Sequence, residues 1–170
     1  MTEKPIENCY WVIPGKLLAG EYPRNLDDPS SLEKLAAFKE AGVATFIDLT
    51  EEGNRLPYAQ WLDTETQTHQ RFPIEDRTIP ASPELTTDIL DMIDNNIAEG
   101  NLVYVHCMGG IGRTGTVVGC WLSRHGYQGE AALDRLGELW DDCPKSAWTR
   151  SPETETQRRY VRDWKEEEGR

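Results

Sequence analysis

The sequence predicts a single α/β domain over residues 1–170, built on a mostly parallel central sheet that is flanked by helices. Two observations lead to this class. Segments of strand type alternate with segments of helix type along most of the chain, which is the order that helical crossovers between parallel strands require. Residues 102–106 also form a short, mostly apolar run, as expected of a strand that both faces of such a sheet bury.

The first half of the chain is expected to supply most of the sheet. Pro14 and Gly15 separate two short apolar runs and indicate the turn of an N-terminal hairpin. Ser30 or Ser31 is a candidate N-cap for the following helix, and Gly42 its stop. The expected elements are hairpin strands over 11–13 and 17–19, a helix from about 30 to 41, a strand over 43–49, an irregular segment over 51–68 with one short helix, and a strand over 69–74.

The second half is expected to be mainly helical around one central strand. Ser82 is a natural N-cap and Pro83 suits the first helical position after it. Apolar residues then recur at every fourth position until Gly100, which is typical of an amphipathic helix. The expected elements are a helix from 83 to 100, the strand over 102–106, and helices over about 113–126, 130–141 and 152–167.

Composition narrows the classes of function. The formal net charge of −12 disfavours nucleic acid and anionic membranes as partners, because both would be repelled. Four cysteines at irregular spacings, without a metal-ligand pattern, indicate free thiols in a reducing compartment. No signal-type or membrane-spanning apolar stretch is evident. We therefore expect a cytoplasmic, monomeric protein without a bound metal.

The loop that follows the central strand carries the chemical information. Cys107 and Arg113 lie six positions apart. This spacing alone is weak evidence for a functional site, because it often occurs by chance. Here, however, the pair lies between a buried strand and the start of a helix, with Gly109, Gly110 and Gly112 between its members. This context predicts an anion-binding loop rather than an accidental pair.

Each residue type in this loop has a physical reason. Glycines let consecutive backbone N–H groups point inward and form a nest for a tetrahedral anion, and the following helix adds its unpaired N–H groups and its dipole. The same field stabilises a thiolate, so Cys107 is expected to be a nucleophile at neutral pH. The planar guanidinium of Arg113 can hold two phosphate oxygens at once.

Residues 106–115 read HCMGGIGRTG and resemble the HCxxGxGRTG motif of the protein-tyrosine and dual-specificity phosphatase superfamily. A looser resemblance extends over residues 15–23 and 73–76 and is most similar to small kinase-associated-type dual-specificity enzymes. It implies that Cys107 forms a phosphocysteine during hydrolysis of phosphotyrosine, and of phosphoserine or phosphothreonine, in a phosphorylated protein substrate. It also implies that no cofactor is needed.

The resemblance further implies an aspartate on a separate loop that protonates the departing oxygen and then, as a base, activates water. Asp76 is the candidate, because it follows a predicted strand and lies one helix and one strand before Cys107. Glu75 and Asp48 are rivals, and each is also readily explained as a surface or loop-capping carboxylate.

Further roles are implied by position in the motif. Thr114 matches a hydroxyl that hydrogen-bonds the cysteine sulfur and eases its departure, and His106 matches a residue that orders the loop. Gln157 matches a late glutamine that positions water, although an ordinary helix residue explains it equally well. The expected phosphate-binding residues are Met108, Gly109, Gly110, Ile111, Gly112 and Arg113.

Three alternatives remain at this point. A phosphoinositide or small-polyphosphate phosphatase could use the same loop, but the variable loop positions 108–111 contain no lysine to meet additional phosphates. A catalytically silent phosphoprotein-binding module would need the nest but neither Cys107 nor Asp76. Sulfurtransferases and arsenate reductases use cysteine loops of similar spacing, and the residues from Gly112 to Gly115 fit them poorly.

Overall fold

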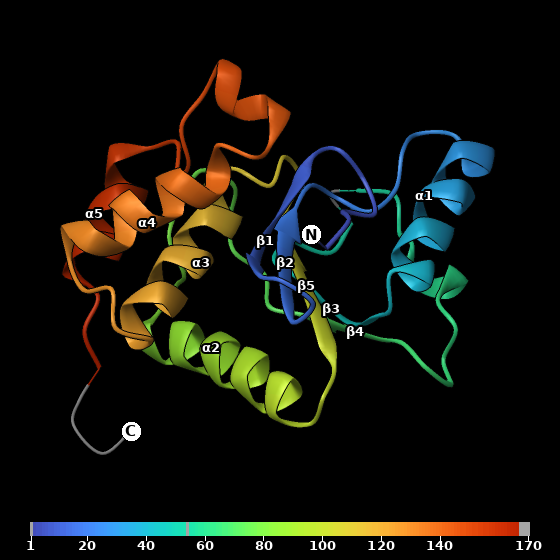
Figure 1. Ribbon diagram of the computed structural model, residues 1–170, viewed down its shortest axis with the longest axis horizontal. Coiled ribbons are helices and arrows are strands. Elements are labelled where there is room, and N and C mark those ends of the chain that lie inside the picture. Colours follow the sequence, from blue (N-terminus) through green and yellow to red (C-terminus); the bar gives the residue numbers. More distant parts are fainter. Residues whose placement is uncertain (1, 54, 167–170) are drawn as a thin grey trace.

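The computed structural model describes residues 2–53 and 55–166, and within these ranges the strands form one five-stranded sheet in the order β1-β2-β5-β3-β4 (Figure 1). The strands are β1 (Cys9–Ile13), β2 (Leu17–Gly20), β3 (Val43–Asp48), β4 (Thr68–Arg71) and β5 (Leu102–His106). The helices are α1 (Asp28–Glu40), α2 (Pro83–Ala98), α3 (Gly112–Arg124), α4 (Glu130–Trp140) and α5 (Glu155–Asp163), with 3₁₀ turns η1 (Ala59–Trp61) and η2 (Pro144–Ala147).

The sheet is mostly parallel, which confirms the predicted fold class. Strands β1 and β2 form the antiparallel hairpin, whereas β2, β5, β3 and β4 all pair in parallel. Strand β5 lies at the centre, between β2 and β3. Its carboxyl end therefore opens at the middle of the sheet, where ligands of such folds gather.

Helices cover both faces of the sheet, with α2 to α5 on one side and α1 on the other (Figure 1). Side chains alternate between these layers along each strand, as pleating requires. Val103 and Val105 of β5 join the core beneath α2, α3 and α4, whereas Tyr104 joins the smaller core in which Phe38 of α1 lies. Burying a side chain of this size contributes about 1.5–3 kcal/mol, so the two cores hold β5 from both faces.

Helix α3 is the most enclosed helix of the described chain, since all its residues except Arg124 are buried. It packs against α2, α4 and α5 and against the sheet. Gly119 allows a close approach to α5, because a Cβ atom there would lie 2.6 Å from the Val161 side chain. The first turn of α3 thus lies at the centre of the domain, directly after the glycine-rich loop.

Several predicted boundaries are corrected by local hydrogen bonds. Helix α1 begins at Asp28, because the Asp27 carboxylate, rather than Ser30 or Ser31, caps it by accepting the Ser30 N–H at 2.8 Å. Strand β4 ends at Arg71, three residues before the predicted end, where Pro73 without an N–H soon follows.

The last helix is shorter than predicted. It begins at Glu155, because the Thr154 hydroxyl and the Gln157 side chain form a reciprocal cap at its start. It ends at Asp163, and Glu167, the predicted end, lies outside the described residues. The predicted short helix of the 51–68 segment is η1, whereas η2 was not predicted.

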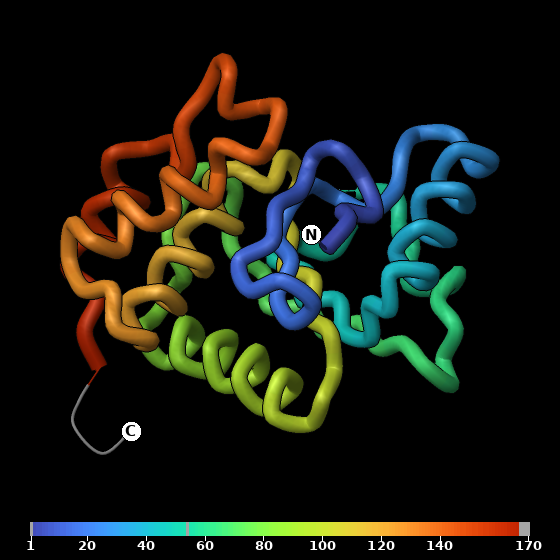
Figure 2. Tube along the Cα trace, in the orientation of Figure 1, coloured from blue at the N-terminus to red at the C-terminus, as the bar shows by residue number. Residues whose placement is uncertain are grey.

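The chain path places the N-terminal hairpin near the centre of the molecule, between α1 and the layer of α2 to α5 (Figure 2). All four cysteines are free and buried. Among the described residues, no helix is long and apolar enough to cross a bilayer.

Candidate active site

The predicted anion-binding loop connects the carboxyl end of β5 with the amino end of α3. Cys107 is only 3% exposed and Arg113 is similarly buried, whereas Met108 reaches the surface. The structure thus brings together the predicted nucleophile, the loop glycines and the N-terminus of α3. Such a helix start supplies free N–H groups and a positive dipole end for an anion.

The loop can curl because Gly110 has left-handed backbone geometry, with φ at +74°. A Cβ atom at this position would collide with the backbone carbonyl of Gly20, at the end of β2. Both the conformation and the close approach therefore require glycine. This contact holds the loop against the carboxyl end of β2.

Contacts from outside the loop hold its carbonyl groups. Three loop oxygens accept such hydrogen bonds: Met108 O from Tyr22 N (2.9 Å), Gly109 O from Lys145 Nζ (2.8 Å) and Ile111 O from Ser151 Oγ (2.6 Å). The C=O and N–H of one trans peptide unit point in opposite directions. The N–H groups that follow these carbonyls are therefore turned away from the outer partners, as a nest for an anion requires.

His106 ties the base of the loop to a buried tyrosine. Burial lowers the pKa of His106 to about 4, against the opposing effect of Asp48, so the imidazole is neutral at pH 7. Its Nδ1 lies 3.1 Å from the carbonyl oxygen of Cys107, which can only accept. The proton is therefore on Nδ1, and Nε2 accepts the hydroxyl of Tyr58 at 2.6 Å.

Arg113 connects the loop with the predicted acid. Its Nη1 donates to the carbonyl oxygen of Ile74 at 3.0 Å, and its Nη2 lies 3.3 Å from the Asp76 carboxylate. The Asp76 side chain is 62% exposed, whereas the guanidinium is almost fully buried. The two groups line a cavity of about 220 Å³ together with Thr50 and Arg55. Asp76 thus lies at the mouth of the cavity and the arginine at its base.

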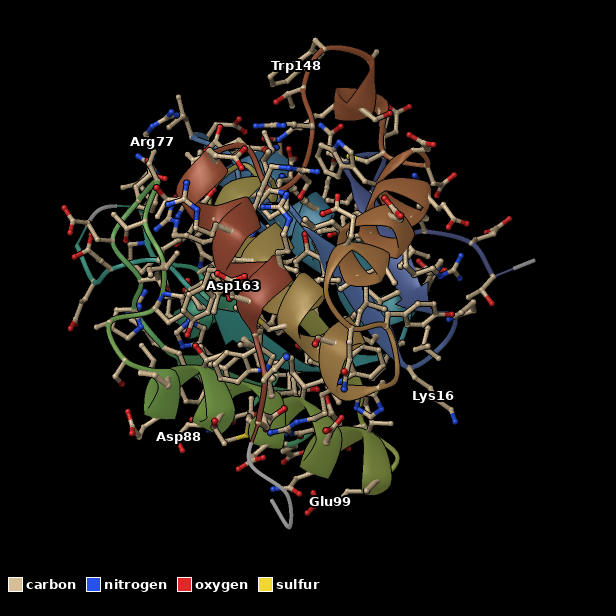
Figure 3. The ribbon with its side chains drawn as sticks, turned by 90° about the vertical axis from the view of Figure 1, so that its left-hand side faces the viewer. Lys16, Arg77, Asp88, Glu99, Trp148 and Asp163 are labelled. Atoms are coloured by element: carbon tan, nitrogen blue, oxygen red, sulfur yellow. The ribbon has the colours of Figure 1, made fainter. Side chains whose placement is uncertain are left out.

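The loop around Asp76, called the acid loop below, lies at an outer end of the molecule. Figure 3 places Arg77, the neighbour of Asp76, at the same end as Trp148, and Asp88 and Glu99 at the opposite end. Arg77 has a positive φ of 66° and an ion pair of 3.6 Å with Glu153. A non-glycine residue rarely adopts this backbone region, so the turn after Asp76 is conformationally demanding.

Thr114 and Gln157 lie beside the start of α3. The Thr114 hydroxyl is buried and has no hydrogen-bond partner, which leaves it available to a ligand or a thiolate. Gln157 is fully buried and already bonds the Thr78 carbonyl through Nε2 and the Thr154 N–H through Oε1. Its role with water therefore stays a prediction, while its role in capping α5 is plain.

The rival carboxylates occupy different settings. Asp48 is buried and accepts hydrogen bonds from the backbone N–H and hydroxyl of Thr50, while His69 and Arg71 lie within 3.2 Å of its other oxygen. Although burial opposes ionisation, these bonds hold the pKa of Asp48 well below its usual range, which makes it a poor proton donor. Glu75 is exposed and adjoins Asp76 without lining the cavity.

Sequence reasoning missed the residues that support the loop, namely Tyr58, Lys145 and Ser151. They come from loops and short 3₁₀ turns, where no periodicity or motif reveals a contact with a distant loop. Within the described residues, no group of three or more His, Cys, Asp or Glu side chains is arranged to hold a metal ion.

Comparison with known proteins shows the family to which the chain belongs. Residues 6–162 match the family model described as "Swiss Army Knife protein, DSP-PTPase phosphatase domain". A putative tyrosine phosphatase, 067L, of Invertebrate iridescent virus 3 is 31% identical over 120 residues, which are 65% of this chain and 44% of that protein.

Two further relatives have names that give different substrate classes, a protein for one and a phospholipid for the other. The mouse dual specificity protein phosphatase CDC14B is 32% identical over 68% of this chain and 24% of its own length. The Arabidopsis thaliana phosphatidylglycerophosphate phosphatase PTPMT1 is 31% identical over 57% and 28%. The chain spans less than half the length of each of these three relatives.

Among solved structures, that of Tk-PTP in the active form superposes with a TM-score of 0.67. The match covers 91% of this chain and 93% of that one, at 24% identity. At this identity the likeness concerns the fold alone. It agrees with the α/β architecture described above.

Proposed function

This chain belongs to the DSP-PTPase family of cysteine-based phosphatase domains, and on that premise we propose that it dephosphorylates proteins. The proposed substrates carry phosphotyrosine, and also phosphoserine or phosphothreonine. The observation that carries this proposal is the arrangement around Arg113, which joins the Cys107 loop to the Asp76 carboxylate at 3.3 Å. Arg113 and Asp76 line one cavity, and Arg113 directly follows the loop that begins at Cys107, which supports a single site for nucleophile, anion and acid.

In the first step, the substrate phosphate occupies the loop nest and Arg113 holds two of its oxygens. The Cys107 thiolate attacks phosphorus, so that an S–P bond forms while the bond to the substrate oxygen breaks. The electron pair of that bond goes to the departing oxygen, and Asp76 supplies its proton. The loop N–H groups stabilise the negative charge on the transferring group.

In the second step, Asp76 is a carboxylate and takes a proton from a water molecule that attacks the phosphocysteine. The S–P bond breaks, inorganic phosphate leaves, and Cys107 is again a thiolate. The unpartnered hydroxyl of Thr114 supports a role in stabilising this leaving thiolate. The proton that Asp76 takes from water restores it as the acid for the next cycle.

The proposal also covers the setting of the reaction. Four buried free thiols suit a reducing compartment, which supports a cytoplasmic location. The net charge of −12 suits a protein substrate with basic surface better than nucleic acid or an anionic membrane. We propose that the domain acts as a monomer on phosphorylated proteins.

The test is hydrolysis of p-nitrophenyl phosphate and of a small phosphopeptide panel, with EDTA present, by the wild type and by Cys107→Ser. Activity that the substitution abolishes is the expected result. A wild type that binds phosphopeptides without hydrolysing anything would instead indicate a silent binding module. Hydrolysis of phosphoinositides but not of phosphopeptides would indicate a lipid phosphatase, the class for which the Arabidopsis relative is named.

A further inference from the structure

A second hollow adjoins the catalytic cavity and has no role in the mechanism above. It is a groove of about 530 Å³. Three exposed apolar side chains line it: Leu26, which is 89% exposed, Leu56, which is 49% exposed, and Met108 of the loop itself. Exposed apolar side chains that gather around one hollow mark an interaction site more often than scattered ones do.

The groove is continuous with the phosphate site. Met108 and Gly109, the two residues that follow the nucleophile, form part of its wall. Arg55 lines both the groove and the catalytic cavity. A substrate whose phosphate occupies the loop nest therefore has this groove within reach of its neighbouring residues.

The far wall of the groove is held in place by hydrogen bonds. The hydroxyl of Tyr22 donates to the carbonyl oxygen of Leu56 at 2.7 Å, and Nη1 of Arg24 donates to that of Pro57 at 3.0 Å. The Arg24 guanidinium also lies over the ring of Trp61, 4.6 Å from its centroid. These bonds fix the 56–61 segment, so the groove is formed before any ligand arrives.

The rim of the groove is locally basic in a strongly acidic chain. Its lining includes Arg24, Lys34, Arg55 and Lys145, against only Glu21 and Asp27. Glu21 is shared by both lysines, at 2.7 Å and 3.0 Å. The phosphate of a phosphopeptide thus meets opposite charge at this face, while a neighbouring apolar side chain meets the apolar groups within the groove.

We propose that this groove binds a large apolar side chain of the substrate polypeptide, one or two residues from the phosphorylated residue. The inference rests on the proposed function and extends it from a reaction to a sequence preference. Leu26 and Leu56 are the residues that contact this side chain and favour an apolar one. The occupant is a peptide side chain rather than a lipid chain, because the chain's net charge of −12 opposes approach to an anionic membrane surface.

The experiment measures kcat/KM for phosphotyrosine heptapeptides that carry either leucine or serine at positions −2, −1, +1 and +2 in turn. For the wild type, leucine is expected to exceed serine by about 10-fold at one of these positions, as burial of one such side chain in a pocket allows. In the double variant Leu26→Ser/Leu56→Ser this preference should fall below about 2-fold. Hydrolysis of p-nitrophenyl phosphate, which has no flanking residue, should not change.

Leu32→Ser is the matched control, since Leu32 is a 47% exposed leucine of α1 that does not line the groove. It should keep the wild-type preference. Equal rates for leucine and serine peptides at every position, with p-nitrophenyl phosphate still hydrolysed, would overturn the inference. So would a double variant that loses activity only towards a dioctanoyl phosphoinositide, because the occupant would then be an acyl chain.

A chain inert towards every substrate would contradict the proposed function without deciding about the groove. The same peptides would then be titrated calorimetrically into the Cys107→Ser variant. A leucine preference in affinity that the double variant loses would support the groove, and its absence would refute it.

Discussion

The anion-binding loop between β5 and α3, here called the phosphate loop, and the acid loop around Asp76 meet at Arg113, yet they are built differently. The phosphate loop is buried, and three of its carbonyl groups are bonded from other parts of the fold. The loop around Asp76 is exposed, and its support includes a Thr78 hydroxyl bonded to its own backbone and a 3.6 Å ion pair of Arg77. On the proposed mechanism, the charge-stabilising site is then held by the fold around it, whereas the proposed proton donor lies on the more exposed loop.

The largest expected effect comes from a substitution at the buried phosphate loop. Arg113→Lys removes the fork that holds two phosphate oxygens and the bond to Ile74 O. We expect kcat/KM for p-nitrophenyl phosphate to fall on the order of 10³-fold. Arg77→Lys, on the exposed loop, should stay within about 2-fold. Similar losses in the two variants would show that the two loops are not distinct in function.

The next effect tests the proton donor. Asp76→Asn should lower kcat for a phosphoserine peptide by about 10²–10³-fold, because a poor leaving group needs a proton. The loss should be smaller for p-nitrophenyl phosphate, whose leaving group is stable as an anion. Glu75→Gln serves as the control and should retain nearly full activity. If Glu75→Gln is the more damaging change, the assignment of the acid is wrong.

A third prediction concerns stability rather than rate. Because the pKa of His106 is about 4 in the fold and near 6.5 when unfolded, the unfolded chain binds more protons between these values. The free energy of unfolding should therefore fall as pH drops from about 6.5 to 4, by on the order of 3 kcal/mol. Asp48, whose pKa is lowered, adds a loss at still lower pH.

Urea unfolding at several pH values from 7 to 4.5 measures this slope. His106→Asn, which replaces the buried imidazole by a side chain that does not titrate, should flatten this slope. A stability that stays constant over this range would mean that His106 is not held neutral in the fold.

The smallest effect compares two matched hydroxyls, each of which donates to a loop carbonyl at 2.6 Å. Ser151→Ala removes the bond to Ile111 of the phosphate loop, and Thr78→Val removes the bond to Glu75 of the acid loop. Ser151→Ala should cost about 1 kcal/mol of unfolding free energy, whereas the exposed bond should cost less. Thermal denaturation of both variants decides this order, and an inverted order would remove the contrast between the loops.

Much of this architecture could be predicted from the sequence. The burial of β5, the amphipathic pattern of α2 and the glycines before Arg113 each reflect a local rule, and so strand, loop and helix fall where expected. The mostly parallel pairing follows from the helices that alternate with the strands. The corrected boundaries, such as the start of α1 at Asp28, depend on which of several adjacent polar side chains forms the cap.

The supporting contacts could not be predicted, for a physical reason. Tyr58, directly before η1, contacts His106 at the base of the loop, and Lys145 of η2 contacts Gly109, from positions 48 and 36 residues away in sequence. Such contacts depend on where tertiary packing places these segments, and no periodicity or motif in the sequence predicts that position. The roles implied by the family motif for Thr114 and Gln157 stay predictions, since their contacts are compatible with those roles but do not require them.

The enclosure of α3 has a consequence for the opening motions of the domain. Amide protons in a helix surrounded by other elements exchange with solvent only when much of the fold opens, whereas those of exposed turns exchange through local fluctuations. Backbone amides of residues 115–122 should therefore exchange at the rate of global unfolding, and those near Asp76 far faster. The helix whose N-terminus adjoins the proposed anion site would then be lost only when the domain itself unfolds.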